Sequence, residues 1–259
     1  MTKEYIGLIE KTLDEVLPKS GGRPAELSAA MRYAVGTGGK RIRPLICLAS
    51  AVAVGGSAED ARYPAAAIEL LHNYTLVHDD LPAMDNDTER RGKPSVWAKF
   101  GEANAILAGD ALQALAFTAL AQAPDRRSGT RAKMIEFFAG CALGVVRGQV
   151  EDIASGVKDV SFIYEHKTAD LFMAAAVTGA LAGGGDDASV EKLRLFAYHL
   201  GVAFQYEDDL LDDDSPFPRD ETARRVQSET DAALAALDGL PGDAMSLAVL
   251  ARSLVNRTH

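Results

Sequence analysis

The sequence has 259 residues, with 27 Lys and Arg against 37 Asp and Glu, so its formal net charge is −10. This balance excludes a wide nucleic-acid footprint, because phosphate binding needs an excess of basic side chains. Apolar residues make up 47% and charged residues 25%, which is the composition of a soluble globular protein. No linker, charge block or repeat divides the chain, so we expect one domain over residues 1–259.

Helical periodicity dominates the chain from its first segment onward. Apolar residues at three- and four-residue spacing between residues 6 and 16 predict an amphipathic helix. Ala-rich runs of the same period follow, separated by Gly and Pro, at 44–54, 64–81, 102–122, 130–153, 159–183, 188–212, 221–237 and 243–256. No segment has the alternation of a strand. Runs that are apolar all round, such as AAVTGALAG, predict central helices, and so an all-α fold that forms a large bundle.

The cysteines and the apolar runs indicate the cellular compartment of the protein. Cys47 and Cys141 each lie within an apolar run, which predicts buried, reduced thiols. The N-terminal segment is charged throughout and lacks the apolar core of a signal peptide. The stretch Leu171–Gly183 is taken as the longest apolar one, and it is too short to span a bilayer comfortably. We expect a cytoplasmic protein without stable membrane insertion.

Two acidic clusters follow apolar helical runs. The first lies in HNYTLVHDDLPAMDND, where Pro82 should end or bend the helix, and the second lies in FQYEDDLLDDD. Their principal carboxylates are Asp79, Asp80 and Asp85 in the first and Asp208, Asp209 and Asp212 in the second.

A helix C-terminus carries partial negative charge, so each exposed carboxylate there costs about 0.3–1 kcal/mol. Two such clusters indicate a compensating cation, although solvated acidic helix ends are the alternative. Asp208 and Asp212 are four residues apart and share a helix face. Oxygen ligands without Cys favour Mg²⁺ over Zn²⁺.

Basic residues that could hold an anion beside such a metal occur in two segments. GGKRIRP, residues 38–44, precedes an apolar helix, and Arg90 and Arg91 follow the first acidic cluster. Glycines and basic side chains at a helix start can bind phosphate, although either segment alone is more commonly a solvated surface run. His72 lies seven residues before Asp79, hence on the same helix face, and Lys167 interrupts an apolar region.

In this order, GGKRIRP, ELLHNYTLVHDDLPAMDNDTERRGKPS, the GD of LAGDAL, HKTADLF and FQYEDDLLD resemble the trans-polyprenyl diphosphate synthases, the farnesyl and geranylgeranyl diphosphate synthase family. The resemblance covers about residues 30 to 213. It implies an all-α bundle around a deep central cavity and a homodimer.

The resemblance also implies roles for individual residues. The six principal carboxylates would hold Mg²⁺ on the diphosphate of the allylic substrate. That substrate would be contacted by Arg90, Lys167, Thr168 and Gln205, and the diphosphate of isopentenyl diphosphate would be bound by Gly39, Lys40, Arg43, His72 and Arg91.

The implied reaction is ionisation of the allylic diphosphate, attack by the isopentenyl double bond and loss of a proton. Metal ions and cations neutralise the departing diphosphate, which is Lewis-acid and electrostatic catalysis.

In this family the floor of the apolar cavity sets product length, and positions five and four before the first aspartate form part of it. Those positions hold Tyr74 and Thr75. Five residues of helix rise about 7.5 Å, so an aromatic ring at Tyr74 would block a growing tail. We expect farnesyl diphosphate as the product. Geranylgeranyl and geranyl diphosphate are the alternatives, and Tyr74 as plain core packing is another.

The chain departs from the family after Asp212. Family members continue through a flap that contains Gly-Lys and a further Lys, whereas the 47 residues after Asp212 contain no Lys. We therefore expect a domain that is shortened after Asp212. Without the flap and its lysines, closure of the site over the allylic diphosphate would be affected.

Three other functions are alternatives to a synthase. A terpene cyclase is disfavoured by the second acidic motif and by GGKRIRP, and a His-Asp phosphohydrolase by the absence of His from residues 1–71. A weakly active or non-catalytic partner subunit of another synthase is the third.

Overall fold

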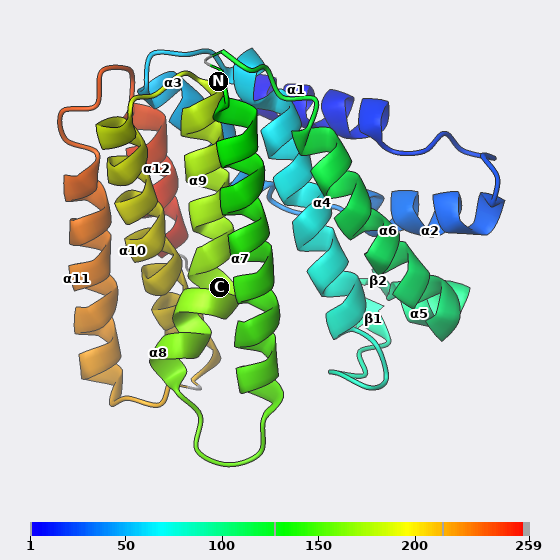
Figure 1. The fold of residues 1–259 in the computed structure, drawn as a ribbon. Helices are drawn as coiled ribbons and strands as arrows, with labels where there is room; N and C mark the ends of the chain where they lie inside the picture. Colours follow the sequence, from blue (N-terminus) through cyan, green and yellow to red (C-terminus); the bar gives the residue numbers. More distant parts are fainter. Residues whose placement is uncertain (1, 127, 214, 256–259) are drawn as a thin grey trace.

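The computed structural model describes residues 2–126, 128–213 and 215–255. These residues form a bundle of helices, as the periodicity predicts (Figure 1). The helices are α1 (Thr2–Val16), α2 (Ala25–Gly36), α3 (Ile42–Ala53), α4 (Arg62–Asp79), α5 (Val96–Phe100), α6 (Glu102–Leu120), α7 (Thr130–Ile153), α8 (Val160–Ile163), α9 (Asp170–Ala182), α10 (Asp187–Asp212), α11 (Arg219–Ala236) and α12 (Met245–Val255). A 3₁₀ turn, η1 (Ala58–Ala61), precedes α4, and a π-helical turn, η2 (Tyr164–Ala169), joins α8 to α9.

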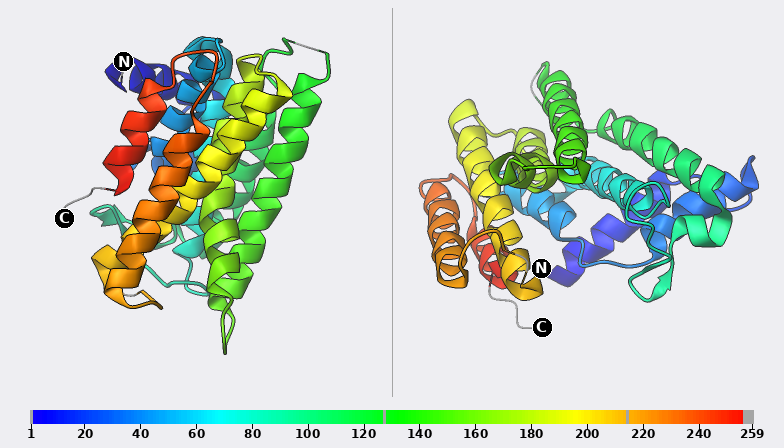
Figure 2. Two further views of the ribbon diagram at one scale, coloured as in Figure 1. Left: turned by 90° about the vertical axis from the view of Figure 1, so that its left-hand side faces the viewer. Right: turned by 90° about the horizontal axis from the view of Figure 1, so that it is seen from below.

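Long helices dominate the arrangement. α7, α9, α10 and α11 run side by side, and α4 and α6 continue the bundle beyond α7 (Figures 1 and 2). α1 and α2 lie across the end of this array. α4 and α10, the two helices that carry the acidic motifs, end at Asp79 and Asp212.

The centre of the bundle consists of α3 and α9. Every residue of α9 is buried, and so is nearly all of α3 after its first two residues, which confirms the expected central helices. Both helices are rich in alanine, so their backbones pack closely. A Cβ on Gly179 of α9 would lie 2.1 Å from the carbonyl oxygen of Cys47 in α3. The glycine is therefore needed for this contact.

Helix boundaries agree with the sequence-based prediction to within a few residues, but the periodic runs omit α2 and α5, and the run 159–183 is divided into α8, η2 and α9. The structure also contains a short hairpin, β1 (Glu89–Arg90) and β2 (Lys93–Pro94), where no strand was predicted. Arg91 and Gly92 both have positive φ, at 56° and 74°, which is the backbone that a two-residue hairpin loop requires. Strands of two residues are too short to show alternation.

Helix α6 corrects the expectation about apolar stretches. Within the described residues it is the one helix long and apolar enough to cross a membrane by length and composition, with a mean hydropathy of 1.3 over its best window. That window is 39% buried inside the bundle, and a core helix of a soluble protein passes the same test. The remaining surface of α6 includes Ile106 and Leu107, whose side chains are exposed.

Substitution of Gly179 tests the close contact of α3 and α9. Because the added methyl group would meet backbone rather than a flexible side chain, Gly179→Ala should lower the free energy of unfolding by about 1–3 kcal/mol. Gly7 lies in the middle of α1 with no atom near its Cβ position, so Gly7→Ala should be neutral or stabilise by up to about 1 kcal/mol. Urea denaturation of both variants measures the difference; equal stabilities would show that α3 and α9 can separate without cost.

Candidate active site

Two adjoining cavities lie among α3, α4, α7, α9 and α10. The first, called here the basic pocket, has a volume of about 600 Å³ and is walled by the residues just before and at the start of α3, by α4 and by the hairpin turn. The second, called the apolar cavity, has about 450 Å³ and lies among α4, α7, η2 and α10. Arg43, His72, Leu76 and Phe204 line both, so these side chains form the boundary between the two.

The basic pocket collects every residue predicted to bind the isopentenyl diphosphate. These are Gly39, Lys40, Arg43, His72 and Arg91. They come from segments far apart in the sequence, and only the fold brings them together.

Two of these side chains are unusual because they are half-buried and their pKa values are shifted. Burial lowers the pKa of Arg43 to about 10, and its Nε has no hydrogen-bond partner, although the guanidinium stacks 4.7 Å from the ring centroid of Phe172. Burial, followed by the charge of Arg43, lowers the pKa of His72 well below 6.5. At neutral pH the pocket therefore holds a poorly compensated Arg43 cation beside a neutral His72, which favours an incoming anion.

Gly39 has a specific steric role at the rim of this pocket. Its φ is +138°, and a Cβ there would lie 2.8 Å from Nη1 of Arg91, which donates a hydrogen bond to the carbonyl oxygen of Gly38. Arg41, the second cation of GGKRIRP, plays a different part. It is buried, with Nη1 2.6 Å from Glu69 and Nε 2.7 Å from Glu10, so its charge is already paired within the fold.

The apolar cavity receives Tyr74 and Thr75 from α4, as the sequence predicted. The ring of Tyr74 packs edge-on against His78, with centroids 5.0 Å apart. His78 in turn lies 3.0 Å, through Nε2, from the carbonyl oxygen of Ile106 in α6. On the opposite side the cavity is lined by apolar side chains of α7, among which Val150 is 60% exposed. The cavity is therefore not closed off from solvent along α7.

The first acidic motif lies at the mouth of the apolar cavity. Asp79 lines the cavity, and burial, aided by the nearby charge of Asp85, raises its pKa to about 6 even though Lys167 acts against this. The backbone N–H of Asp85 donates to the carbonyl oxygen of Asp79 at 2.9 Å, which folds the loop after α4 back over the helix end. A partly buried carboxylate with a raised pKa near a second carboxylate is suited to a cation.

The second acidic motif occupies the last turns of α10. Oδ1 of Asp209 accepts a hydrogen bond from Nε2 of Gln205 at 3.0 Å, and Oδ2 accepts one from the hydroxyl of Tyr164. Asp208 is near enough to Arg43 to raise the pKa of that guanidinium against burial. Among the described residues, no three acidic, His or Cys side chains are already gathered closely enough to hold one metal ion. The donors are all carboxylate oxygens, a set that fits Mg²⁺.

Three of the four residues predicted to contact the allylic substrate line the apolar cavity: Lys167, Thr168 and Gln205. Oγ1 of Thr168 donates to Oε1 of Gln205 at 2.8 Å, and Nζ of Lys167 forms an ion pair with Asp152.

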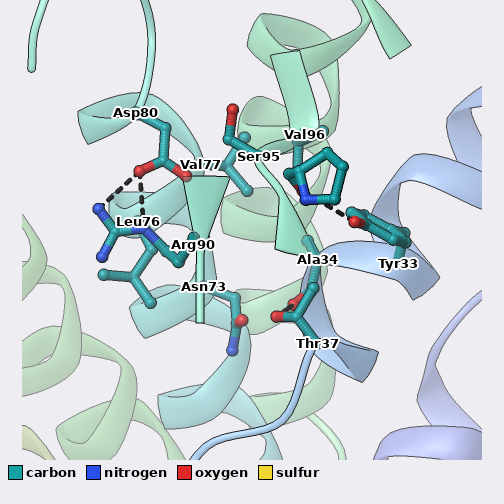
Figure 3. A pocket seen from close by; sticks show the side chains of 11 residues that line it. Tyr33, Ala34, Thr37, Asn73, Leu76, Val77, Asp80, Arg90, Ser95 and Val96 are labelled. Atoms are coloured by element: carbon teal, nitrogen blue, oxygen red, sulfur yellow. Dashed lines mark hydrogen bonds and ion pairs between the residues drawn. The ribbon is translucent and has the colours of Figure 1, made fainter. Parts of the chain in front are cut away.

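The structure does not place the fourth, Arg90, among the side chains that line this cavity. It lies in a narrow crevice beside the hairpin, where Nε and Nη2 are each 2.6 Å from Oδ1 of Asp80 (Figure 3). Asp80 is 2% exposed, and burial raises its pKa despite this pairing. The charges of Asp80 and Arg90 are thus paired with each other in this conformation.

Sequence reasoning missed three residues of the site. Gln149 lines the apolar cavity with a buried Nε2 that has no partner, Asp152 pairs with Lys167, and Tyr164 binds Asp209. Gln149 and Asp152 are three residues apart near the end of α7, so their spacing on one helix face was a usable signal.

Comparison with known proteins agrees with this geometry. The fold matches solved prenyltransferases: geranylgeranyl pyrophosphate synthetase from Pyrococcus horikoshii has a TM-score of 0.90 at 30% identity, covering 99% of this chain and 97% of that one. An FPP/GFPP synthase from Zymomonas mobilis has a TM-score of 0.87 at 33% identity, covering 98% of this chain and 100% of that one. The class is that of the all-α isoprenoid synthases.

The sequence pattern described as Polyprenyl synthetase matches residues 24–217, and the chain belongs to this family. It is 43% identical over 218 residues to the heterodimeric geranylgeranyl pyrophosphate synthase large subunit 1 of Arabidopsis thaliana, covering 79% of this chain and 58% of that protein. It is 42% identical over 213 residues to the farnesyl diphosphate synthase of Geobacillus stearothermophilus, covering 79% and 71%. The chain thus spans just under three fifths of the length of the plant relatives.

Asp170, behind η2, gives a test of the electrostatics near the site. Burial raises its pKa to about 6, although Nδ1 of His166 lies 2.8 Å from its Oδ2. Above pH 6 the folded protein must therefore carry a buried charge that the unfolded chain carries in water. This cost vanishes below the ordinary carboxyl pKa near 4, where both states are protonated.

Asp170→Asn should therefore stabilise the protein at pH 8 by up to about 3 kcal/mol and have little effect at pH 4. Denaturant titrations at the two pH values measure this, with Asp231→Asn on the exposed side of α11 as the control. A gain that is the same at both pH values would contradict the argument.

Proposed function

We propose that this protein is a Mg²⁺-dependent trans-prenyltransferase that condenses isopentenyl diphosphate with an allylic diphosphate. The observation that carries the proposal is the pair of cavities separated by Arg43 and His72. One is basic and suits a diphosphate; the other is apolar, begins at an acidic helix end and suits a hydrocarbon tail. This arrangement fits a pair of substrates in which the diphosphate of isopentenyl diphosphate lies in the basic pocket and the tail of the allylic diphosphate lies in the apolar cavity.

Each polar group has a part in this reaction. Lys40, Arg43 and Arg91 would hold the isopentenyl diphosphate, and the neutral His72 can donate a hydrogen bond to it. Lys167, Thr168 and Gln205 would orient the allylic diphosphate at the mouth of the apolar cavity. The apolar side chains around it keep water away from an allylic cation.

Mg²⁺ would be held by the six carboxylates of the two acidic motifs, those of Asp79, Asp80, Asp85, Asp208, Asp209 and Asp212. When bound, it supplies the positive charge that stabilises the departing diphosphate. Asp80 would have to exchange its pairing with Arg90 for this role, which would release Arg90 toward the allylic diphosphate.

For the product we propose farnesyl diphosphate, with geranylgeranyl diphosphate as the alternative. Tyr74 lines the apolar cavity together with Thr75, in keeping with a bulky floor that stops a growing tail. The relatives include both farnesyl and geranylgeranyl synthases, so they support either product.

The first test is incubation with Mg²⁺, labelled isopentenyl diphosphate and, separately, dimethylallyl, geranyl and farnesyl diphosphates. We expect a fifteen-carbon product from the two shorter primers and none from the third. Asp79→Asn should lower kcat by about 100-fold or more, because a charged group at the reacting centre is lost. No product from any primer would overturn the proposal and favour the partner subunit, which mixing with an active synthase would reveal.

Tyr74→Ser tests the floor of the cavity. Removal of the ring should lengthen the product by at least one five-carbon unit, as chromatography of the dephosphorylated alcohols would show. Tyr63→Ser is the matched control, since Tyr63 lies on the same helix and contacts Arg62 instead. A twenty-carbon product from the unaltered protein, or an unchanged product from Tyr74→Ser, would remove Tyr74 from this role.

We also propose a homodimer formed through α6 and α7. The two helices lie along the same outer edge of the bundle (Figure 2). Their exposed faces carry large apolar side chains, namely Ile106, Leu107, Leu143, Val146, Val150 and Ile153. Exposed apolar side chains gathered on neighbouring helices are typical of a protein interface.

Leu107→Glu combined with Leu143→Glu should therefore convert a dimer to monomers, because the change would place two charges in a dry interface. Sedimentation analysis measures the mass. Val249→Glu on α12, where the side chain is 58% exposed, should leave the dimer intact. A monomeric unaltered protein would refute this interface.

We propose a cytoplasmic location as well. Its support is that Cys47 and Cys141 are buried free thiols, which suits a reducing compartment.

A further inference from the structure

The turn η2 interrupts the regular α-helix between α8 and α9, and it lies beside the apolar cavity. It is π-helical over Tyr164–Ala169, between α8 and α9. Such turns are rare, and they pack less regularly than an α-helix, so they persist where neighbouring elements hold them. η2 contains both Lys167 and Thr168, the two residues of this segment that line the apolar cavity.

Two glycines on neighbouring helices touch the backbone of this turn. A Cβ on Gly148 of α7 would lie 2.3 Å from the nitrogen of Lys167, 2.8 Å from its Cα and 2.9 Å from the carbonyl carbon of His166. A Cβ on Gly201 of α10 would lie 2.5 Å from the Cα of Ala169. Both contacts are with main-chain atoms, so rotation of a side chain cannot relieve them. The turn would have to move.

Displacement of the turn would reach the acidic motif of α10. Thr168 donates to Gln205, which donates to Asp209, and Tyr164 donates to the same carboxylate. On the other side Lys167 pairs with Asp152 of α7. The backbone position of η2 therefore sets where Lys167 and Thr168 lie relative to Asp209.

We propose that Gly148 is a positioning residue for the allylic diphosphate: by lacking a side chain, it lets η2 approach α7 and so places Lys167 and Thr168. This inference rests on the proposed function. Gly201 holds the same turn from α10. Glycine is the poorest helix former apart from proline, so its presence inside α7 is unfavourable locally and is explained here by the contact with η2.

The chain contains a matched control for this role. Gly140 lies two helical turns before Gly148 in α7, and no atom lies within 4 Å of its Cβ position. Gly140→Ala and Gly148→Ala therefore make the same chemical change in the same helix. They differ in whether the methyl group meets η2.

The experiment compares apparent KM values for the two substrates in the full-length protein. Gly148→Ala should raise the KM for geranyl diphosphate by about 10- to 100-fold. Displacement of Lys167 and Thr168 by a fraction of a helical turn would weaken their contacts with this substrate. The KM for isopentenyl diphosphate should change less than about twofold, because the basic pocket does not touch η2. Gly140→Ala should leave both unchanged. Equal behaviour of the two variants, or an equal loss for both substrates, would overturn the proposal.

A binding measurement separates this inference from the proposed function. Calorimetry with inorganic diphosphate and Mg²⁺ should show weaker binding by Gly148→Ala than by Gly140→Ala, whether or not condensation occurs. An unaltered protein that binds diphosphate but makes no product would refute the function alone. If Gly148→Ala melts below the assay temperature, Gly201→Ala takes its place and should give the same split; absence of the split would overturn the proposal.

Discussion

The close packing of α3 against α9 is the constraint on which the site depends. α3 carries Arg43 in its first turn, and α9 continues directly from the turn that contains Lys167 and Thr168. With Gly179 against the carbonyl of Cys47, the two helices are held at a separation that no larger residue would allow. The first turn of α3, with Arg43, and the turn before α9, with Lys167 and Thr168, are thereby held relative to one another. Alanine and glycine, residues without chemistry of their own, determine the distance between groups that have it.

Charge near the site is distributed so that no sign is fully neutralised. Arg41 is paired twice within the fold, whereas Arg43, two residues later, is half-buried and has a buried Nε without a partner. Asp80 is paired with Arg90, whereas Asp79 next to it has a pKa of about 6. In each case one of two neighbouring residues stabilises the local structure, and the other is left with an unfavourable charge that a ligand of opposite sign would relieve.

Periodicity was sufficient for much of the fold, and motif order for most of the polar residues that line the two cavities. The periodic pattern of an amphipathic or wholly apolar helix extends over many residues. The long helices and the central position of α9 could be predicted for this reason. The gathering of Gly39, Lys40, Arg43, His72 and Arg91 in one pocket followed from the resemblance to a family.

Features that depend on single contacts between distant segments could not be predicted in this way. The hairpin turn at Arg91 and Gly92 depends on two positive φ angles, and the pairing of Arg90 with Asp80 depends on where that hairpin lies. The periodic run 159–183 covers Tyr164–Ala169, but the π-helical geometry of this turn could not be predicted, because its close backbone contacts are with glycines of other helices.

The wall that α7 contributes to the apolar cavity affects how the volume of that cavity is to be interpreted. Val146, Val150 and Ile153 line the cavity, and yet each is at least 39% exposed. The apolar cavity is thus incompletely covered by protein along α7. In the proposed homodimer, a partner surface that rests on these three residues would complete the wall, so the capacity of the cavity would depend on the assembly and not on a single chain.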